Sequence, residues 1–270
     1  MKNFSYILLC AFALLVSCTP YNDILKSRDI EYKYEAAKAF YLEGSYSKAA
    51  PLLEGLITLL KGSDKAEESL FMLAMCYYES GDYYTASQYF KTYYSNYQRG
   101  DYTELARLYS GKSLYNDIAE PALDQTDTYA AIQELQLFME YFPASKYYDE
   151  VQKMLFDMHD VLVKKELLSA QLYYDLGDYM AHHGNNYLAC ILTAQNTLND
   201  YPYTKFREDL SILILRAKYK MALHSVEEKR IDRYRDTVDE YYSFKNEFPT
   251  SKYLSEAEDY YTKSLEVVSE

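Results

Sequence analysis

The sequence contains no tryptophan and few of the residues that build tight turns. Its 270 residues include six prolines and eight glycines, too few for the many turns of an all-β protein. Basic residues are also scarce, since 28 Lys and Arg stand against 41 Asp and Glu and give a net charge of −13. An acidic chain without a basic patch repels phosphate backbones, so the composition argues against nucleic acid as a partner.

Cysteine is scarce, whereas tyrosine is abundant, with 34 residues. Two of the four cysteines, Cys10 and Cys18, lie near the start of the chain. The other two, Cys76 and Cys190, fall where a helical pattern needs a small apolar residue, and we expect both to be buried free thiols. A disulfide between them stays open, because spacing alone cannot decide it.

The first eighteen residues resemble a lipoprotein signal peptide. Lys2 is followed by an apolar run over 7–16, which is too short to cross a hydrocarbon core of ~30 Å as a helix. The run ends in Leu15-Val16-Ser17-Cys18, which is similar to a lipobox. This resemblance implies cleavage before Cys18 and a covalent lipid on that residue. The alternative is an ordinary signal peptide with a chance cysteine.

The rest of the chain contains an internal repeat. Apolar residues at helical spacing lead to a glycine, which tolerates the left-handed conformation that ends a helix, and a second apolar helix follows. One copy comprises Leu70, Leu73, Ala74, Tyr77, Gly81, Tyr83, Ala86, Phe90 and Tyr93. The other, 37 residues earlier, comprises Ala36, Ala37, Phe40, Gly44, Tyr46, Ala49, Leu53 and Leu56. The outline is similar to the tetratricopeptide pattern, apart from its leading Trp and closing Pro.

A second signature, aromatic-Pro-x-Ser/Thr-Lys-aromatic, occurs three times, at Phe142–Tyr147, Tyr201–Phe206 and Phe248–Tyr253. Proline disfavours a helical conformation in the residue before it, and Ser or Thr can cap the next helix. The spacings of 59 and 47 residues exceed the ~34 of a minimal repeat, so long helices or enlarged loops are expected. We predict helices over 128–142, 187–201, 229–248 and 253–268, a loop over 116–126 and an enlarged turn over 182–186.

These patterns predict an all-α fold, a superhelical solenoid of about five tetratricopeptide-type hairpins plus a C-terminal helix. The expected organisation is a signal peptide over 1–17, a lipidated tether over 18–28, N-terminal repeats over 29–145 and C-terminal repeats over 146–270.

The sequence offers no catalytic constellation. It has no HExxH, no Gly-x-Ser-x-Gly and no phosphate-binding glycine loop. His182-His183 could bind a metal, but a solvated turn is the simpler interpretation, and His159 and His224 have no partner at ligand spacing. We therefore expect no enzymatic activity, no metal and no cofactor other than lipid on Cys18.

In tetratricopeptide proteins, the first helix of each hairpin lines a groove. Mapped through Gly44 and Gly81, the groove positions are Glu31, Tyr34, Lys38, Tyr41, Glu68, Phe71, Met75 and Tyr78. We predict a partner-binding groove made of Tyr34, Lys38, Tyr41, Phe71, Met75 and Tyr78, since Tyr and Met favour permissive binding surfaces. The alternative is that several of these side chains pack against adjacent helices. A separate surface is expected around 173–219.

The lipobox, the tether and the hairpins together resemble the BamD family. Two local runs add to this resemblance, Ala131–Phe138 before Tyr141-Phe142-Pro143, and 165–177 closing at Asp200–Thr204. The expansion at 182–186, the acidity and the tyrosine content depart from the family pattern.

The BamD resemblance implies a subunit of the machinery that inserts β-barrel proteins into the outer membrane. It would be anchored in the inner leaflet and face the periplasm. The N-terminal repeats would meet unfolded barrel proteins, and the C-terminal repeats would dock the core barrel subunit. The alternatives are another periplasmic tetratricopeptide adaptor, for envelope or cell-division coordination, a glycan-capture lipoprotein, which typically uses Trp platforms, and an α-helical enzyme.

Overall fold

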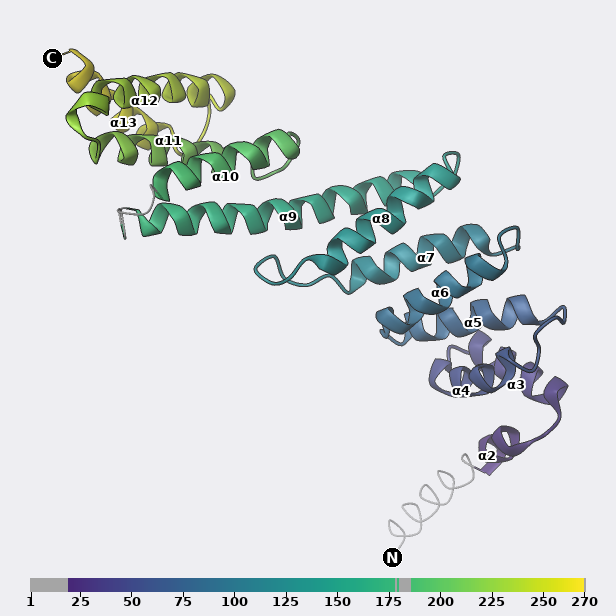
Figure 1. Ribbon diagram of the computed structural model, residues 1–270. Helices are drawn as coiled ribbons and strands as arrows, with labels where there is room; N and C mark the ends of the chain where they lie inside the picture. Colours follow the sequence, from purple (N-terminus) through teal and green to yellow (C-terminus); the bar gives the residue numbers. More distant parts are fainter. Residues whose placement is uncertain (1–18, 178, 180–185, 270) are drawn as a thin grey trace, which may run out of the picture. The chain divides into compact units, whose positions relative to one another are not determined.

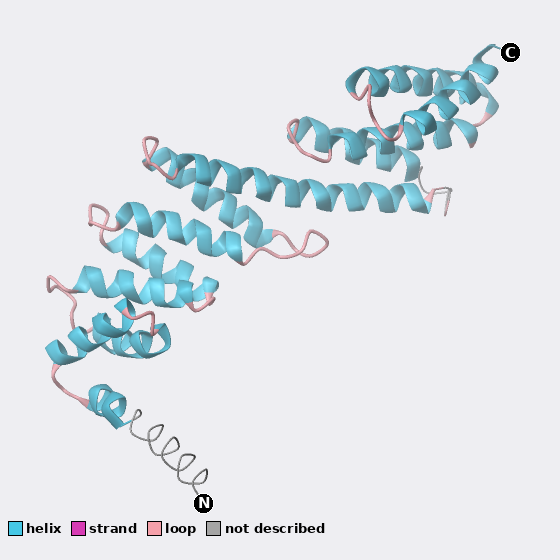
Figure 2. Cartoon of the chain, turned by 180° about the vertical axis from the view of Figure 1, so that it is seen from behind, coloured by secondary structure: helices cyan, strands magenta, loops and turns pink. Residues whose placement is uncertain are grey.

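The computed structural model describes residues 19–177, 179 and 186–269 (Figure 1). This part of the chain is helical and contains no strand, as Figure 2 shows, so the all-α prediction is confirmed. The helices are α2 (Thr19–Lys26), α3 (Ile30–Leu42), α4 (Tyr46–Ile57), α5 (Ala66–Glu79), α6 (Tyr83–Asn96), α7 (Thr103–Asn116), α8 (Thr126–Tyr141), α9 (Tyr148–Leu176), α10 (Asn186–Asp200), α11 (Arg207–Leu223), α12 (Glu227–Glu247) and α13 (Leu254–Ser269). The expected signal peptide, Cys18 and His182-His183 lie outside the described residues.

Consecutive helices pair as antiparallel hairpins of the tetratricopeptide type. The pairs are α3/α4, α5/α6, α7/α8, α9/α10 and α11/α12, with α13 packed against α12. Five hairpins and a C-terminal helix match the predicted number. The four helices predicted downstream are α8, α10, α12 and α13, with ends within two residues of those expected, and the loop between α7 and α8 is also confirmed.

The chain divides into two compact units. Among the described residues, unit 1 comprises residues 19–118 and Thr126–Val151, and unit 2 comprises Ala119–Gln125 and those from Gln152 onwards. Within unit 1, α4 packs on α5 and α6 on α7; within unit 2, α10 packs on α11. Each unit therefore buries its apolar residues between neighbouring hairpins.

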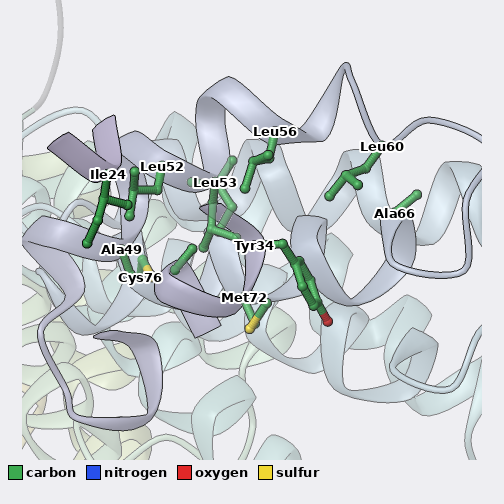
Figure 3. Close-up of a cluster of buried hydrophobic side chains, with 12 residues drawn as sticks. Ile24, Tyr34, Ala49, Leu52, Leu53, Leu56, Leu60, Ala66, Met72 and Cys76 are labelled. Carbon is green, nitrogen blue, oxygen red and sulfur yellow. The ribbon is translucent and has the colours of Figure 1, made fainter. Parts of the chain in front are cut away.

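The core of unit 1 contains the repeat residues that the sequence pattern selected. Leu53 and Leu56 of α4 are fully buried with Ala49, and Figure 3 shows them beside Tyr34 and Met72. In the second copy, the fully buried residues are Leu73, Ala74, Ala86, Phe90 and Tyr93. Gly44 and Gly81 end their helices with φ of 74° and 80°, in the left-handed region that favours glycine. The repeat pattern is therefore confirmed.

The expected tether is partly helical. Residues 19–26 form α2, whose Ile24 is buried in the unit 1 core. The Tyr21 ring contacts Phe40 edge-on at 5.7 Å, and its hydroxyl donates to the backbone oxygen of Lys48 at 3.1 Å. The chain is thus held against the first hairpin from Tyr21 onwards.

Cys76 and Cys190 are both buried free thiols, as expected. Each has a neighbouring helix packed over it, and burial raises the pKa of each thiol to about 12. They therefore act as small apolar core residues.

The three proline-containing segments are the turns into α9, α11 and α13. In each turn the Ser or Thr hydroxyl accepts the backbone N–H two residues ahead, just before the next helix begins. The pairs are Ser145 with Tyr147 at 3.1 Å, Thr204 with Phe206 at 3.2 Å and Ser251 with Tyr253 at 2.9 Å. Their predicted role as junctions between hairpins is confirmed.

Two further turns have the same backbone pattern without proline. Ser63 accepts the N–H of Lys65 in the turn before α5, at 3.3 Å. In the turn before α7, Gly100 replaces the Ser or Thr, and a Cβ there would lie 2.8 Å from the carboxyl carbon of Glu67. The sequence signature missed both turns because it was defined by proline.

A carboxylate from an earlier helix binds each of these five turns. Glu31 pairs with Lys65, Glu67 accepts from the N–H of Asp101 at 2.7 Å, Glu104 from Ser145 at 2.6 Å, Asp160 from Thr204 at 2.7 Å and Asp209 from the Tyr253 hydroxyl at 3.0 Å. Hydrogen bonds to ionised acceptors are stronger than neutral ones, so these contacts fix one hairpin against the next.

Helix α9 differs from the other helices in its length of 29 residues. Glu31, Glu67, Glu104 and Asp209 lie in the first turns of their helices. Asp160, in contrast, lies in the middle of α9. The residues of α9 just before Asp160 therefore run past the turn at 201–206.

The packing of α7 on α8 gives a stability prediction. A Cβ on the buried Gly111 would lie 2.7 Å from Cγ of Leu135, which is itself fully buried. Gly111→Ala should therefore lower the free energy of unfolding by about 1–3 kcal/mol, the usual cost of overpacking. Gly55→Ala is the control: Gly55 lies in α4 with nothing near its Cβ position, and the change should stabilise by roughly 0.5–1 kcal/mol. Urea unfolding of both variants measures this, and equal stabilisation by both would contradict it.

Candidate functional site

The predicted groove residues come from α3 and α5 of unit 1. Tyr34, Lys38 and Tyr41 lie on α3, and Phe71, Met75 and Tyr78 lie on α5. We call this set the α3–α5 groove. All six residues lie on the first helix of a hairpin, as predicted, but their side chains differ in solvent exposure.

Three of the six side chains are buried in the folded chain. Tyr34 is 3% exposed, and Phe71 and Met75 are each 8% exposed. The Phe71 ring stacks on Tyr102 with centroids 4.6 Å apart and contacts Phe90 edge-on at 5.8 Å. These residues pack between adjacent helices, which was the alternative left open by the sequence.

An ionic cluster joins α3 to α5 in this groove. Glu68 accepts a hydrogen bond from the Tyr34 hydroxyl and forms an ion pair with Lys38 at 2.8 Å. The Lys65 amine lies over the Tyr34 ring, 4.7 Å from its centroid. The positive charge of Lys38 is therefore matched by a carboxylate from the same groove.

The pKa shifts follow from these contacts. Burial first, and then the hydrogen bond to Glu68, raise the pKa of Tyr34 to about 12. Burial alone would raise the pKa of Glu68, but hydrogen bonds from Lys38 and Tyr34 and the charge of Lys38 together hold it below its ordinary value. The hydrogen bond to Glu68 raises the pKa of Lys38, although partial burial opposes it. At neutral pH, Glu68 and Lys38 are therefore charged, and Tyr34 is a neutral hydrogen-bond donor.

A small cavity brings part of the groove together. It has a volume of about 90 Å³ and is lined by Lys38, Tyr41, Leu42, Glu68, Phe71, Met72 and Tyr102. Tyr102, which precedes α7, belongs to the next hairpin and was not among the predicted groove residues. A pattern defined within single hairpins cannot find a wall that a neighbouring hairpin supplies.

Tyr78 lies apart from this cavity. Its ring contacts Tyr109 edge-on at 4.9 Å, and its hydroxyl accepts a hydrogen bond from the Asn116 amide at 3.1 Å. The half-buried side chains Lys38, Tyr41 and Tyr78 are the groove residues that solvent still reaches.

The arrangement offers binding surface and ionic contacts. In the described part of the chain, no three His, Cys, Asp or Glu side chains are grouped as metal ligands would be. Within residues 19–177 and 186–269, none of the helices combines the length and the hydropathy needed to span a bilayer.

Comparison with known proteins places most of the chain in one family. The family model YfiO, described as an outer membrane lipoprotein, matches residues 27–230. The matched segment runs from just before α3 to the start of α12, so it includes parts of both units. A search of curated proteins found no match.

The Glu68 cluster gives a pH-dependent stability prediction. The folded-state pKa of Glu68 lies below its ordinary value of 4.5. The stabilisation of the fold by ionised Glu68 is therefore present above pH 4.5 and is lost as the pH falls through the folded-state pKa. Glu68→Gln should lower the free energy of unfolding at pH 7 by roughly 1 kcal/mol. The difference from the unaltered protein should shrink on acidification below pH ~4.

Urea unfolding at several pH values measures this difference. The control is Glu43→Gln, because the exposed Glu43 side chain forms no hydrogen bond or ion pair with another described residue. A Glu68 effect that is constant with pH, or equal to that of the control, would contradict the prediction.

Proposed function

The chain belongs to the YfiO family of outer membrane lipoproteins, and from this membership we propose that it is a scaffold subunit of the outer-membrane β-barrel assembly machinery. The observation that carries the proposal is a family match over residues 27–230, which is most of the hairpin array. Such a scaffold binds other proteins and catalyses no reaction.

The proposed anchor is lipid on Cys18. The segment Leu15-Val16-Ser17-Cys18 has the lipobox pattern, and two or three acyl chains hold a protein durably on a membrane. Helix α2 begins at Thr19 and packs against the first hairpin, so the anchor would hold unit 1 near the bilayer surface. We place the protein in the inner leaflet of the outer membrane, facing the periplasm.

The proposed partners are two. Unfolded barrel proteins would bind the α3–α5 groove, where Lys38, Tyr41 and Tyr78 remain accessible, because aromatic and long flexible side chains accept varied sequences. The core barrel subunit would dock on the C-terminal repeats. Tetratricopeptide lipoproteins that coordinate envelope growth or division have the same fold and anchor, so the partners are what separates the two functions.

Affinity capture tests the proposed assembly. The protein, tagged at its C-terminus and extracted from outer membranes in mild detergent, should co-purify with a β-barrel core subunit. Tyr41→Ala should reduce cross-linking to an unfolded barrel protein several-fold and leave capture of the core subunit unchanged. Tyr84→Ala is the matched control, since Tyr84 is an exposed aromatic on α6. Recovery of division or peptidoglycan proteins alone would overturn the assignment.

Membrane fractionation tests the anchor. Cys18→Ala removes the acceptor thiol, and since no other segment is proposed to hold the protein on the bilayer, the protein should move from the membrane pellet to the soluble fraction. Metabolic labelling with a fatty acid should mark the unaltered protein and not the variant. A variant that stays in the pellet after a salt wash would disprove the anchor at Cys18.

A further inference from the structure

Unit 2 contains a cleft of about 680 Å³ between α9 and the turn at 201–206. It is lined by Phe156, His159 and Asp160 of α9 and by residues 200–205, and we call it the unit 2 cleft. It forms where α9 runs past the turn. Its volume is in the range typical of ligand-binding pockets.

Two aromatic residues of the cleft are exposed to solvent. Tyr203 is 87% exposed and Phe156 is 50% exposed. The turns at 142–147 and 248–253 have the same hydrogen bonds, but they carry Ala144 and Thr250 where this turn carries Tyr203. The fold of this turn therefore does not require a large ring at position 203, and Tyr203 and Phe156 together give the cleft an exposed aromatic lining.

The cleft carries an excess of one negative charge. Asp160 is satisfied within the turn, since it accepts from Thr204 at 2.7 Å and pairs with the Lys205 amine at 3.2 Å. The exposed carboxylate of Asp200 has no hydrogen bond or ion pair with any other residue that the structure describes. Burial lowers the pKa of His159, so this imidazole adds no positive charge at neutral pH.

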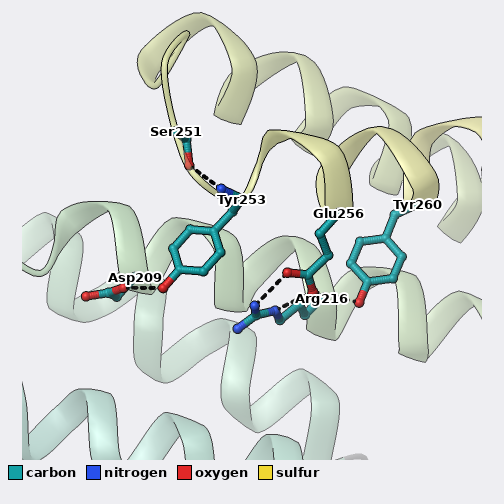
Figure 4. Close-up of polar contacts among 6 residues, drawn as sticks. All are labelled: Asp209, Arg216, Ser251, Tyr253, Glu256 and Tyr260. Atoms are coloured by element: carbon teal, nitrogen blue, oxygen red, sulfur yellow. Dashed lines mark hydrogen bonds and ion pairs between the residues drawn. The ribbon is translucent and has the colours of Figure 1, made fainter.

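Elsewhere in unit 2, a carboxylate and an aromatic ring bind an arginine side chain of the protein itself. Arg216 forms two hydrogen bonds of 2.7 Å with Glu256, and its guanidinium lies over the Tyr253 ring, 5.2 Å from the centroid (Figure 4). The residues lining the unit 2 cleft include one unpaired carboxylate, Asp200, and the exposed rings of Tyr203 and Phe156. The neighbouring Arg207 donates to the backbone oxygen of Pro202 at 3.2 Å and forms an ion pair with Glu247, so its charge is already matched.

We propose that the unit 2 cleft binds an arginine side chain from an extended segment of a partner protein. The planar guanidinium would stack on an aromatic face and donate paired hydrogen bonds to Asp200. The chain's acidic balance favours a basic partner, and Pro202 and Phe156 offer apolar surface to the residues flanking the arginine. The proposed site belongs to unit 2 and shares no residue with the α3–α5 groove. The arginine-binding proposal holds whichever envelope machinery the protein serves.

Binding of short capped peptides to the full chain in detergent tests the proposal. The probe is acetyl-Gly-Arg-Gly-amide, and the matched probe carries citrulline, which has the shape of arginine without its charge. By NMR titration, the arginine peptide should bind and the citrulline peptide should bind at least tenfold more weakly. Asp200→Asn and Tyr203→Ala should each weaken arginine binding at least fivefold, whereas Glu43→Gln and Tyr84→Ala, exposed residues of unit 1, should leave it unchanged.

Several outcomes would overturn the proposal. Equal binding of the arginine and citrulline peptides would show that the charge of the guanidinium has no role. If acetyl-Gly-Phe-Gly-amide binds more tightly than the arginine peptide, the cleft is a pocket for neutral aromatic groups. If the arginine peptide does not bind, or if Tyr203→Ala and Asp200→Asn leave its binding unchanged, the cleft is not an arginine site. Binding of phosphatidylethanolamine vesicles that needs Tyr203 while the peptide fails would assign the cleft to a lipid headgroup. Circular dichroism of both variants should match the unaltered chain, since both side chains are exposed.

Discussion

Carboxylates that reach from one helix to the turn ahead of a later helix hold the hairpins in register. Each of five turns receives one, from Glu31 through to Asp209, and each turn begins a new helix. Burial of apolar residues drives neighbouring hairpins together but is not directional. The charged hydrogen bonds are directional, because they form only when the two helices have the correct displacement along their axes.

The same constraint accounts for an unusual composition. Tyrosine hydroxyls donate to carboxylates on other helices in the pairs Tyr34–Glu68, Tyr77–Glu54, Tyr93–Glu67, Tyr94–Glu134 and Tyr253–Asp209. A tyrosine ring fills space between helices as phenylalanine would, and its hydroxyl satisfies a carboxylate at the edge of the core. Abundant Tyr and abundant Asp and Glu are thus explained together, because each tyrosine hydroxyl in these pairs needs a carboxylate on a neighbouring helix.

Two of the surfaces that this packing leaves carry the proposed binding functions. In unit 1, neighbouring helices use most of the α3–α5 groove, and Lys38 is already paired with Glu68. In unit 2, the extra length of α9 creates a cleft in which the exposed Phe156, Tyr203 and Asp200 side chains form no hydrogen bond, ion pair or ring contact with another described residue. Each surface has its own proposed ligand: unfolded barrel proteins at the α3–α5 groove and a basic segment of a partner protein at the unit 2 cleft.

The sequence alone determined the all-α class, the number of hairpins and the core positions such as Ala74, Ala86 and Phe90, because helical periodicity and glycine helix ends are local features. It also located three junctions by their prolines. Only the tertiary structure decided that Tyr34, Phe71 and Met75 are buried and that Tyr102 closes the small cavity, because burial depends on which helix covers a side chain. The unit 2 cleft was equally beyond the sequence, since it arises from how far α9 extends past a turn about 45 residues later, and no local pattern encodes that distance.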